Sequence, residues 1–340
     1  ARDLWGDRRA GGWAAALLLT TPMYFTLGSA MTTDAPLFVF WTWGLWAAYR
    51  ALIWERPRAW YELGAAVGLG ALAKLSIGLL PACVGAAVLL VPQWRRHLRS
   101  PQLWLGLAVM LAAMSPLLIW NAQHDWVNFR HEMGHVHNTG WSGLRLLRFG
   151  AGQFFALSPV VVVVAVMTLY RQPRDIGRRL LWDVSLACIA FFIFKAAGAK
   201  VELNWPAPVY IGLFILLAGE AARLSARRRR WLIGGMLSSV LILGLAYFPM
   251  IMGLAGKRDP FHEAKLWQDA IVRAGEEPAA AGARFILAPN YKLASELAFY
   301  WPQRLPVYLA AAGERRYNQF DLWPGPNREA IAAAARSVAS

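Results

Sequence analysis

Nine long apolar segments constrain the fold of this 340-residue chain more than any other feature. Most approach the roughly 20 residues that a helix needs to cross a bilayer. Lipid offers backbone N–H and C=O groups no hydrogen-bond partner, so segments of this kind satisfy their own backbone groups as helices. The sequence therefore predicts a mainly α, polytopic helical membrane protein. Its membrane segments are expected at about 13–28, 35–53, 61–73, 75–92, 102–120, 149–170, 180–198, 205–220 and 231–253.

One of these segments is interrupted. Segment 61–73 is short and stops at Lys74, and the new apolar run that follows contains Pro81. Half-length apolar segments separated by polar residues often mark a binding site at the membrane. We therefore expect residues near this interruption to take part in a site.

The basic residues predict the orientation of the segments. Alternation through the nine segments places eighteen arginines of the connecting loops on one side. Loops rich in Lys and Arg stay in the cytoplasm, so that side is predicted to be cytoplasmic. The opposite side receives six basic residues, which are Lys74, Arg130, Arg145, Arg148, Lys195 and Lys200.

Composition excludes several classes of protein. The chain is 57% hydrophobic and 16% charged, against about 25% charged residues in an average soluble domain. Its 18 Trp, 16 Phe and 10 Tyr exclude a disordered chain. A net charge of +15 would be compatible with a nucleic-acid-binding protein. The arginine clusters, however, lack the interleaved aromatic residues of such proteins. No nucleic-acid partner is expected. The two cysteines, Cys83 and Cys188, lie in apolar runs and are expected to be small packing residues.

The end of the chain differs from the rest. Residues 255–340 have a nearly balanced charge, with 11 basic and 9 acidic residues. Residues 284–288 and 305–309 are predicted strands, and residues 291–300 a predicted helix. The sequence thus predicts a transmembrane domain over 1–254 and a small C-terminal periplasmic α/β domain over 255–340.

Two ionisable residues stand at the outer ends of apolar segments. Burial of such groups at membrane depth is costly, which makes them functional candidates. Asp34 opens the second segment, as either a helix N-cap or a catalytic carboxylate. Lys74 either reaches to the interface or provides a cation for a phosphate, between the small residues Gly70 and Gly78.

The outer loop 121–148 contains a literal HExxH motif. On a helix, this spacing places His131 and His135 on one face with Glu132 beside them, as in zinc proteases. Glu202 on the same side is a possible further ligand. A membrane zinc metalloprotease is therefore an alternative, as is a non-catalytic membrane scaffold. No cofactor is required by the other motifs, and a divalent metal ion is the one candidate.

Six stretches, in order along the chain, resemble one family. They are GSAMTTDAPL (28–37), GLGALAK (68–74), WNAQHDW (120–126), NWPAP (204–208), NYKLASELAFY (290–300) and NQFDLWP (318–324). Together they resemble the bacterial family 39 glycosyltransferases, which include aminoarabinose transferases and protein mannosyltransferases.

The resemblance implies a multi-pass protein of GT-C architecture in the bacterial inner membrane. Its partners would be a polyprenyl-phosphate sugar donor, an envelope acceptor (lipid A, protein or glycan) and the lipid bilayer. The active site would lie at the outer ends of the helices, where the charge pattern places the polar residues. The principal acidic motif of the family, with its general base, is expected upstream of Ala1.

The resemblance also implies roles for single residues. Lys74 matches a position that binds the donor phosphate, and Asp34 a secondary acidic position that supports the active site. Arg130 and His135 are weaker matches to a loop that contacts phosphate or a divalent ion. The acceptor side is expected to be lined by Gln123, Glu202 and Asn204.

Overall fold

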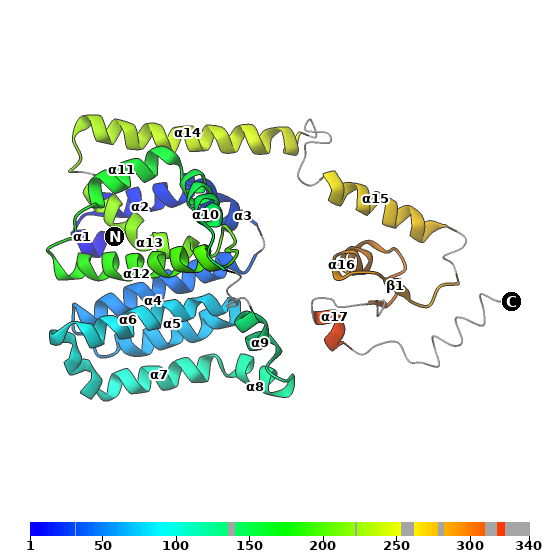
Figure 1. Ribbon diagram of the computed structural model, residues 1–340, viewed down its shortest axis with the longest axis horizontal. Coiled ribbons are helices and arrows are strands. Elements are labelled where there is room, and N and C mark those ends of the chain that lie inside the picture. The colour runs from blue at the N-terminus through cyan, green and yellow to red at the C-terminus, as the bar shows by residue number, and fades with distance from the viewer. Residues whose placement is uncertain are drawn as a thin grey trace. The chain divides into compact units, whose positions relative to one another are not determined.

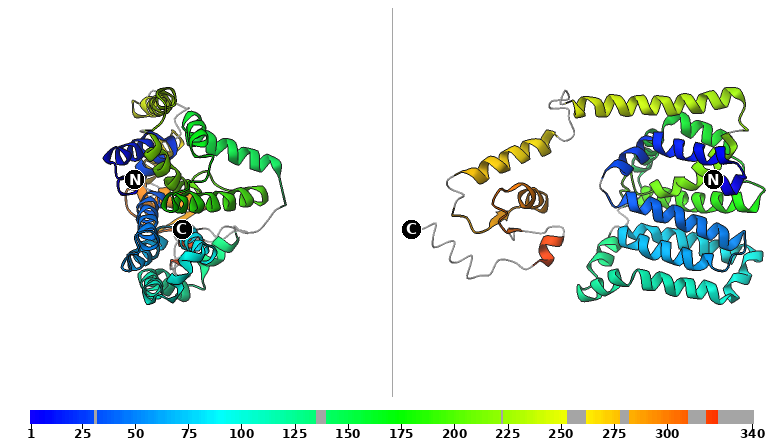
Figure 2. Two further views of the ribbon diagram at one scale, coloured as in Figure 1. Left: turned by 90° about the vertical axis from the view of Figure 1, so that its left-hand side faces the viewer. Right: turned by 180° about the vertical axis from the view of Figure 1, so that it is seen from behind.

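The computed structural model describes residues 1–30, 32–134, 140–221, 223–252, 262–277, 282–309 and 318–323. It is mainly helical, as the apolar segments predict. Contacts divide the chain into two units, Ala1–Leu245 and Ala246–Ser340, with the boundary inside the last turns of α14 (Ala226–Ile251). Each unit is described by itself, and α14 is described with the first. The helical unit (Figures 1 and 2) comprises α1 (Arg2–Trp5), α2 (Arg8–Thr20), α3 (Pro22–Ser29), α4 (Asp34–Leu52), α5 (Ala59–Ala73), η1 (Leu75–Gly78), α6 (Leu79–Leu90), η2 (Pro92–Arg99), α7 (Pro101–Ala113), α8 (Ser115–Gln123), α9 (Val127–Gly134), α10 (Gly143–Ala156), α11 (Pro159–Leu169), α12 (Ile176–Gly198), η3 (Ala207–Val209), α13 (Tyr210–Ala221) and α14 (Ala226–Ile251).

Helices form at each predicted segment, but several segments are bent. The chain turns by 51° between α7 and α8 and by 97° between α10 and α11. Both breaks precede a proline, which lacks an N–H group and disfavours helix at the residue before it. By length and composition, one described helix, Ile176–Gly198, can cross a membrane by itself; up to four spans result if each of three bent pairs counts as one. The bends within segments 102–120 and 149–170 were not predicted, because both segments were expected as uninterrupted apolar runs.

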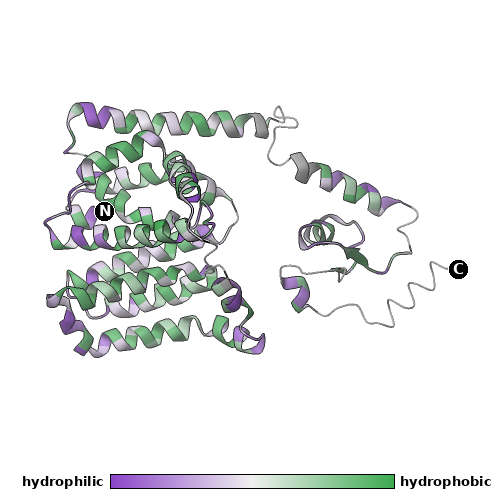
Figure 3. Cartoon of the chain, viewed as in Figure 1, coloured by the Kyte–Doolittle hydropathy of each residue, from purple (hydrophilic) through white to green (hydrophobic). Residues whose placement is uncertain are grey.

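The arginine-rich loops gather at one end of the helical unit. Figure 1 shows that α4 ends, and α12 and α14 begin, at the same end. In Figure 3 this end is hydrophilic, whereas the helices between the two ends are mostly hydrophobic. The opposite end carries the start of α4, the end of α5 and the end of α12. We refer to these as the arginine end and the Asp34 end.

Apolar side chains also cover part of the outer surface. On α14, Leu237, Leu241, Leu245 and Phe248 are each more than half exposed. Their spacing of three or four residues places them along one face of the helix. An exposed apolar face of this length fits contact with lipid chains rather than water.

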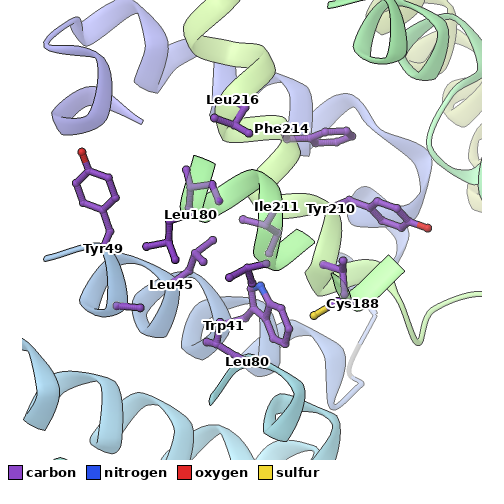
Figure 4. Close-up of a cluster of buried hydrophobic side chains, with 14 of the residues drawn as sticks. Trp41, Leu45, Tyr49, Leu80, Leu180, Cys188, Tyr210, Ile211, Phe214 and Leu216 are labelled. Atoms are coloured by element: carbon purple, nitrogen blue, oxygen red, sulfur yellow. The ribbon is translucent and has the colours of Figure 1, made fainter. Parts of the chain in front are cut away.

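The core of the helical unit lies where α4, α6, α12 and α13 meet. Trp41 and Leu45 of α4 pack with Leu80 of α6, Leu180 of α12 and Ile211 of α13 (Figure 4). All five side chains are at most 2% exposed. This core holds the start of α4 against the segment that follows α12, which positions the site described below.

Glycines bring α5 and α7 into close contact. A Cβ atom on Gly64 would lie 1.9 Å from the carbonyl oxygen of Gly106, and one on Gly68 would lie 2.5 Å from the carbonyl oxygen of Met110. Gly64 and Gly68 are four residues apart, the spacing by which small residues allow membrane helices to approach closely. The α5–α7 contact thus depends on the absence of side chains at these positions.

The two cysteines lie against each other. Cys83 of α6 and Cys188 of α12 are free thiols whose sulfur atoms are 3.3 Å apart. A disulfide bond is about 2.05 Å long, so a shift of about 1 Å would join them. Copper phenanthroline should therefore cross-link α6 to α12 within one chain, detected as a linked peptide by mass spectrometry. The Cys83→Ser variant is the control. Recovery of only unlinked peptides from the oxidised protein would contradict this packing.

The second unit contains α15 (His262–Glu276), β1 (Ile286–Ala288), α16 (Tyr291–Tyr300), β2 (Val307–Leu309) and α17 (Gln319–Leu322). The two strands pair in parallel, with Ile286 opposite Val307. Each strand starts two residues later than predicted, whereas α16 has the predicted bounds. Asn290 caps α16 by accepting a hydrogen bond from the backbone N–H of Leu293 at 3.0 Å. The periplasmic location of this unit stays a prediction.

Candidate active site

Asp34 is the buried centre of a polar cluster at the Asp34 end. It is the first residue of α4, and its side chain is 3% exposed. The N-cap position is held by Thr33 instead. The interpretation of Asp34 as an N-cap is therefore wrong, because both of its carboxylate oxygens are engaged by side chains from distant parts of the chain.

Lys74 provides the first of these partners. Its Nζ lies 2.7 Å from Oδ1 of Asp34. Lys74 stands between α5 and η1 in an extended conformation, and its backbone N–H donates to the carbonyl of Gly70 at 2.9 Å. A Cβ on Gly70 would meet the side chain of Ile77 at 2.1 Å, so the glycine lets the chain fold back over the end of α5. The predicted interruption at Lys74 is thus the element that aims this lysine at α4.

Asn204 provides the second partner. Its Nδ2 donates to Oδ2 of Asp34 at 2.7 Å. The two oxygens of one buried carboxylate therefore face an ammonium group and a side-chain amide. The pair of Asp34 and Lys74 is neutral as a whole, and the amide adds a hydrogen bond without charge. We call Asp34, Lys74 and Asn204 the polar triad.

A second layer of hydrogen bonds holds the segment that carries Asn204. Nε2 of Gln153 in α10 donates to the carbonyl of Leu203 at 3.0 Å, and the hydroxyl of Tyr210 donates to Oε1 of Gln153 at 3.1 Å. The hydroxyl of Tyr24 in α3 donates to the carbonyl of Ala207 at 2.5 Å. Sequence reasoning missed these three side chains. The only signal was a glutamine inside an apolar segment.

A cavity adjoins the triad. It has a volume of about 680 Å³ and lies between α3, α10 and the segment before η3. Its lining includes Met23, Phe155, Glu202 and Asn204. Most of its walls are apolar, with polar groups from 202–204 on one side. Glu202 also forms an ion pair with Lys200 at 2.8 Å, at a half-exposed position.

The long outer loop does not join the triad through bonds that the structure describes. Gln123 ends α8 and Arg130 lies in α9; both are exposed, and neither side chain forms a hydrogen bond or ion pair within the described residues. Instead, the buried Asn121 organises this loop: its Nδ2 donates to the carbonyl of Leu117, and its Oδ1 accepts from the N–H of Asn128. These roles for Gln123 and Arg130 therefore stay predictions.

The metal site also stays a prediction. His131 and Glu132 lie in α9, whereas His135 lies outside the described residues. Within the part of the chain that the structure describes, no three His, Cys, Asp or Glu side chains gather as ligands. Among these residues, Glu202 does not join His131 and Glu132 in a group of ligands.

Lys195 is a further cation that the sequence reasoning did not select. It lies in the last turn of α12, with its Nζ 4.6 Å from the ring centre of Trp205, next to Asn204. Its charge also interacts with that of Glu132 in α9. Lys195 therefore lies between the outer loop and the segment that carries the triad amide.

The sequence around this site is similar to that of known glycosyltransferases. Residues 1–120, which include Asp34 and Lys74, match the family of dolichyl-phosphate-mannose-protein mannosyltransferases. The lipid A galacturonosyltransferase RgtD of Rhizobium johnstonii is 29% identical over 212 residues, which are 60% of this chain and 44% of the relative. Both matches are to glycosyltransferases. This confirms the resemblance drawn from the sequence motifs. The chain spans less than half the length of this relative. No solved structure matches.

Proposed function

We propose that this chain carries the active site of a membrane glycosyltransferase. The enzyme would move a sugar from a polyprenyl-phosphate donor to a cell-envelope acceptor on the outer face of the inner membrane. The observation that carries the proposal is the polar triad, where Lys74 and Asn204 meet the buried Asp34 at the end opposite the arginines. The family match over residues 1–120, which contain Asp34 and Lys74 but not Asn204, supports it.

In the proposed reaction, a hydroxyl oxygen of the acceptor attacks the anomeric carbon of the sugar. The bond from that carbon to the phosphate oxygen breaks, the lipid phosphate leaves with the electron pair, and the hydroxyl proton passes to a carboxylate base. Negative charge grows on the phosphate in the transition state. A fixed cation at that point lowers the barrier because it requires no reorganisation.

Lys74 is suited to this role. A lysine ammonium group has three N–H donors, and Asp34 accepts one of them. The Lys74 side chain is 21% exposed, so its remaining N–H groups can reach a phosphate. Asp34 is the positioning residue, since it holds the ammonium in one place, and Asn204 holds the carboxylate. The adjoining cavity of about 680 Å³, with Glu202 and Asn204 in its wall, would receive the acceptor.

The relative also indicates which substrates to test first. Its name assigns it a galacturonosyl group and lipid A as acceptor. We propose the same classes for this chain, so a polyprenyl-phosphate galacturonosyl donor with a lipid A acceptor is the first pair to assay. Protein and glycan acceptors are the comparison arms.

The test is the Asp34→Asn variant of the intact protein, assayed for release of polyprenyl phosphate. Misplacement of a catalytic group by about 1 Å can cost about 100-fold in rate. We expect a loss of about this size, seen in kcat more than in KM. The control is Glu55→Gln, which removes an exposed carboxylate paired with Arg96 at the arginine end. Turnover by Asp34→Asn equal to that of the control would overturn the proposed site.

A further inference from the structure

A second polar cavity lies at the opposite end of the helical unit from the triad. It has a volume of about 440 Å³ and is formed by the end of α11, the start of α12 and the end of α13. Its lining includes Arg171, Arg174 and Arg178, together with Asp175 and Glu220. The proposed glycosyl transfer uses none of these residues.

The carboxylates in this cavity are already engaged. Asp175 accepts a hydrogen bond from the backbone N–H of Arg178 at 2.9 Å. Glu220 lies 3.7 Å from a guanidinium nitrogen of Arg178 and 3.8 Å from one of Arg223. Arg178 also lies 3.7 Å above the ring of Trp5, which fixes its position.

Two arginines of the cavity have no anionic partner. Arg171 lies 5.0 Å from the ring centre of Tyr170, and neither Arg171 nor Arg174 forms an ion pair within the described residues. Both side chains are exposed at the mouth of the cavity. The cavity therefore offers two free guanidinium groups to an anion, and guanidinium is well suited to phosphate oxygens.

An apolar groove begins where the basic cavity ends. The groove has a volume of about 350 Å³ and lies between α11, α12 and α13, and Leu169 lines both spaces. The indole N–H of Trp182 donates to the carbonyl of Leu169 at 3.1 Å, which fixes the wall where they meet. The groove extends along α11 from Leu169 to Val162 and reaches Leu157 at the end of α10. A helix of this size is about 16 Å long, roughly half the hydrocarbon thickness of a bilayer.

We propose that the cavity and groove together bind one anionic glycerophospholipid of the surrounding leaflet. The phosphate would lie between Arg171 and Arg174, and one acyl chain would follow the groove along α11. The charge of the cavity, the apolar character of the groove and their junction at Leu169 select this occupant over a free anion. Basic pockets between membrane helices on the cytoplasmic side are suited to such headgroups.

Native mass spectrometry of the purified protein tests the headgroup contacts. Phosphatidylglycerol and phosphatidylcholine with identical acyl chains are the probes. The double variant Arg171→Gln/Arg174→Gln should bind phosphatidylglycerol about 30-fold more weakly, since each basic residue near an anionic headgroup contributes about 1 kcal/mol. The variant Arg171→Lys/Arg174→Lys keeps both positive charges and should retain the preference for phosphatidylglycerol. Retained binding would show that substitution at these two positions does not unfold the site.

The control for charge is Arg56→Gln/Arg58→Gln, which removes two exposed arginines from the same end but outside the cavity. It should leave phosphatidylglycerol binding unchanged. Equal binding of the two lipids by the unmodified protein would overturn the proposal. An equal loss in the Arg56/Arg58 control would do so too, because attraction to the whole arginine end would then explain the binding.

The groove has its own test. Val166 lines the groove and is exposed, so Val166→Trp should fill it and weaken binding of both lipids. Val163→Trp on the same helix, also exposed but outside the groove, should not. If Val166→Trp has no effect and inorganic phosphate displaces phosphatidylglycerol, the cavity is a free-anion site and the lipid proposal is overturned.

Discussion

Replacement of Lys74 by methionine should abolish sugar transfer and destabilise the helical unit by about 3–5 kcal/mol. The substitution removes the cation 2.7 Å from Asp34, whose side chain is 3% exposed. A buried carboxylate without its partner is costly because the interior cannot replace the hydration that was lost. Asn204 would remain as a neutral donor. Stability is measured by unfolding of the purified protein in detergent, and transfer by release of polyprenyl phosphate.

A double variant separates the two roles of Lys74. Lys74→Met/Asp34→Asn removes both charges, so most of the lost stability should return. Transfer should fall well below that of Asp34→Asn alone, because the donor phosphate then loses its cation as well. Lys200→Met is the stability control, because that lysine is 81% exposed, and exposed pairs contribute little, about 0–1 kcal/mol. Transfer by the double variant equal to that of Asp34→Asn alone would show that Lys74 only neutralises Asp34, and would remove it from the chemistry.

Replacement of Gly64 by alanine should destabilise the helical unit by about 3 kcal/mol or more, at the upper end of overpacking effects. The new Cβ would lie 1.9 Å from the carbonyl oxygen of Gly106. Backbone atoms cannot rotate away as a side chain can, so α5 and α7 must separate. Separation would weaken contacts along both helices, which lie side by side in Figures 1 and 2. Thermal unfolding in detergent measures the loss.

Gly85→Ala is the matched control for this prediction. Gly85 lies within α6, and nothing lies within 4 Å of a Cβ built there. Alanine favours helix over glycine by about 1 kcal/mol, so this variant should be as stable as the unmodified protein or slightly more so. Equal stability of the Gly64→Ala and Gly85→Ala variants would show that the close α5–α7 contact does not form.

Part of the candidate site could be predicted from single positions. Lys74 and Asp34 were found because an ionisable residue next to an apolar segment is unusual by itself. Asn204 came from the resemblance to family 39. Their convergence could not be predicted, since Asp34 and Asn204 are 170 residues apart in the sequence. No local pattern encodes a contact over that separation.

Other residues show the limits of pattern reading. Gln153 and Tyr210 lie within apolar segments, and only the folded chain brings Gln153 to the carbonyl of Leu203 and Tyr210 to Gln153. Cys83 and Cys188 were expected to be small packing residues, but nothing in the sequence predicted that their sulfur atoms would lie 3.3 Å apart. In each case the partner is at least 50 residues away in the sequence, and such contacts depend on how whole helices and the segments between them pack.

The sequence by itself determined the helical character of the chain, the position of each apolar segment and the separation of arginines from the candidate site. These properties follow from hydropathy and charge, which each segment carries whatever its neighbours are. Only the tertiary structure decided where segments bend, which glycines allow helices to touch, and that Lys74 and Asn204 share one carboxylate. These features depend on packing between residues that are distant in the sequence. The role of a side chain there is set by the residue that it contacts on another segment.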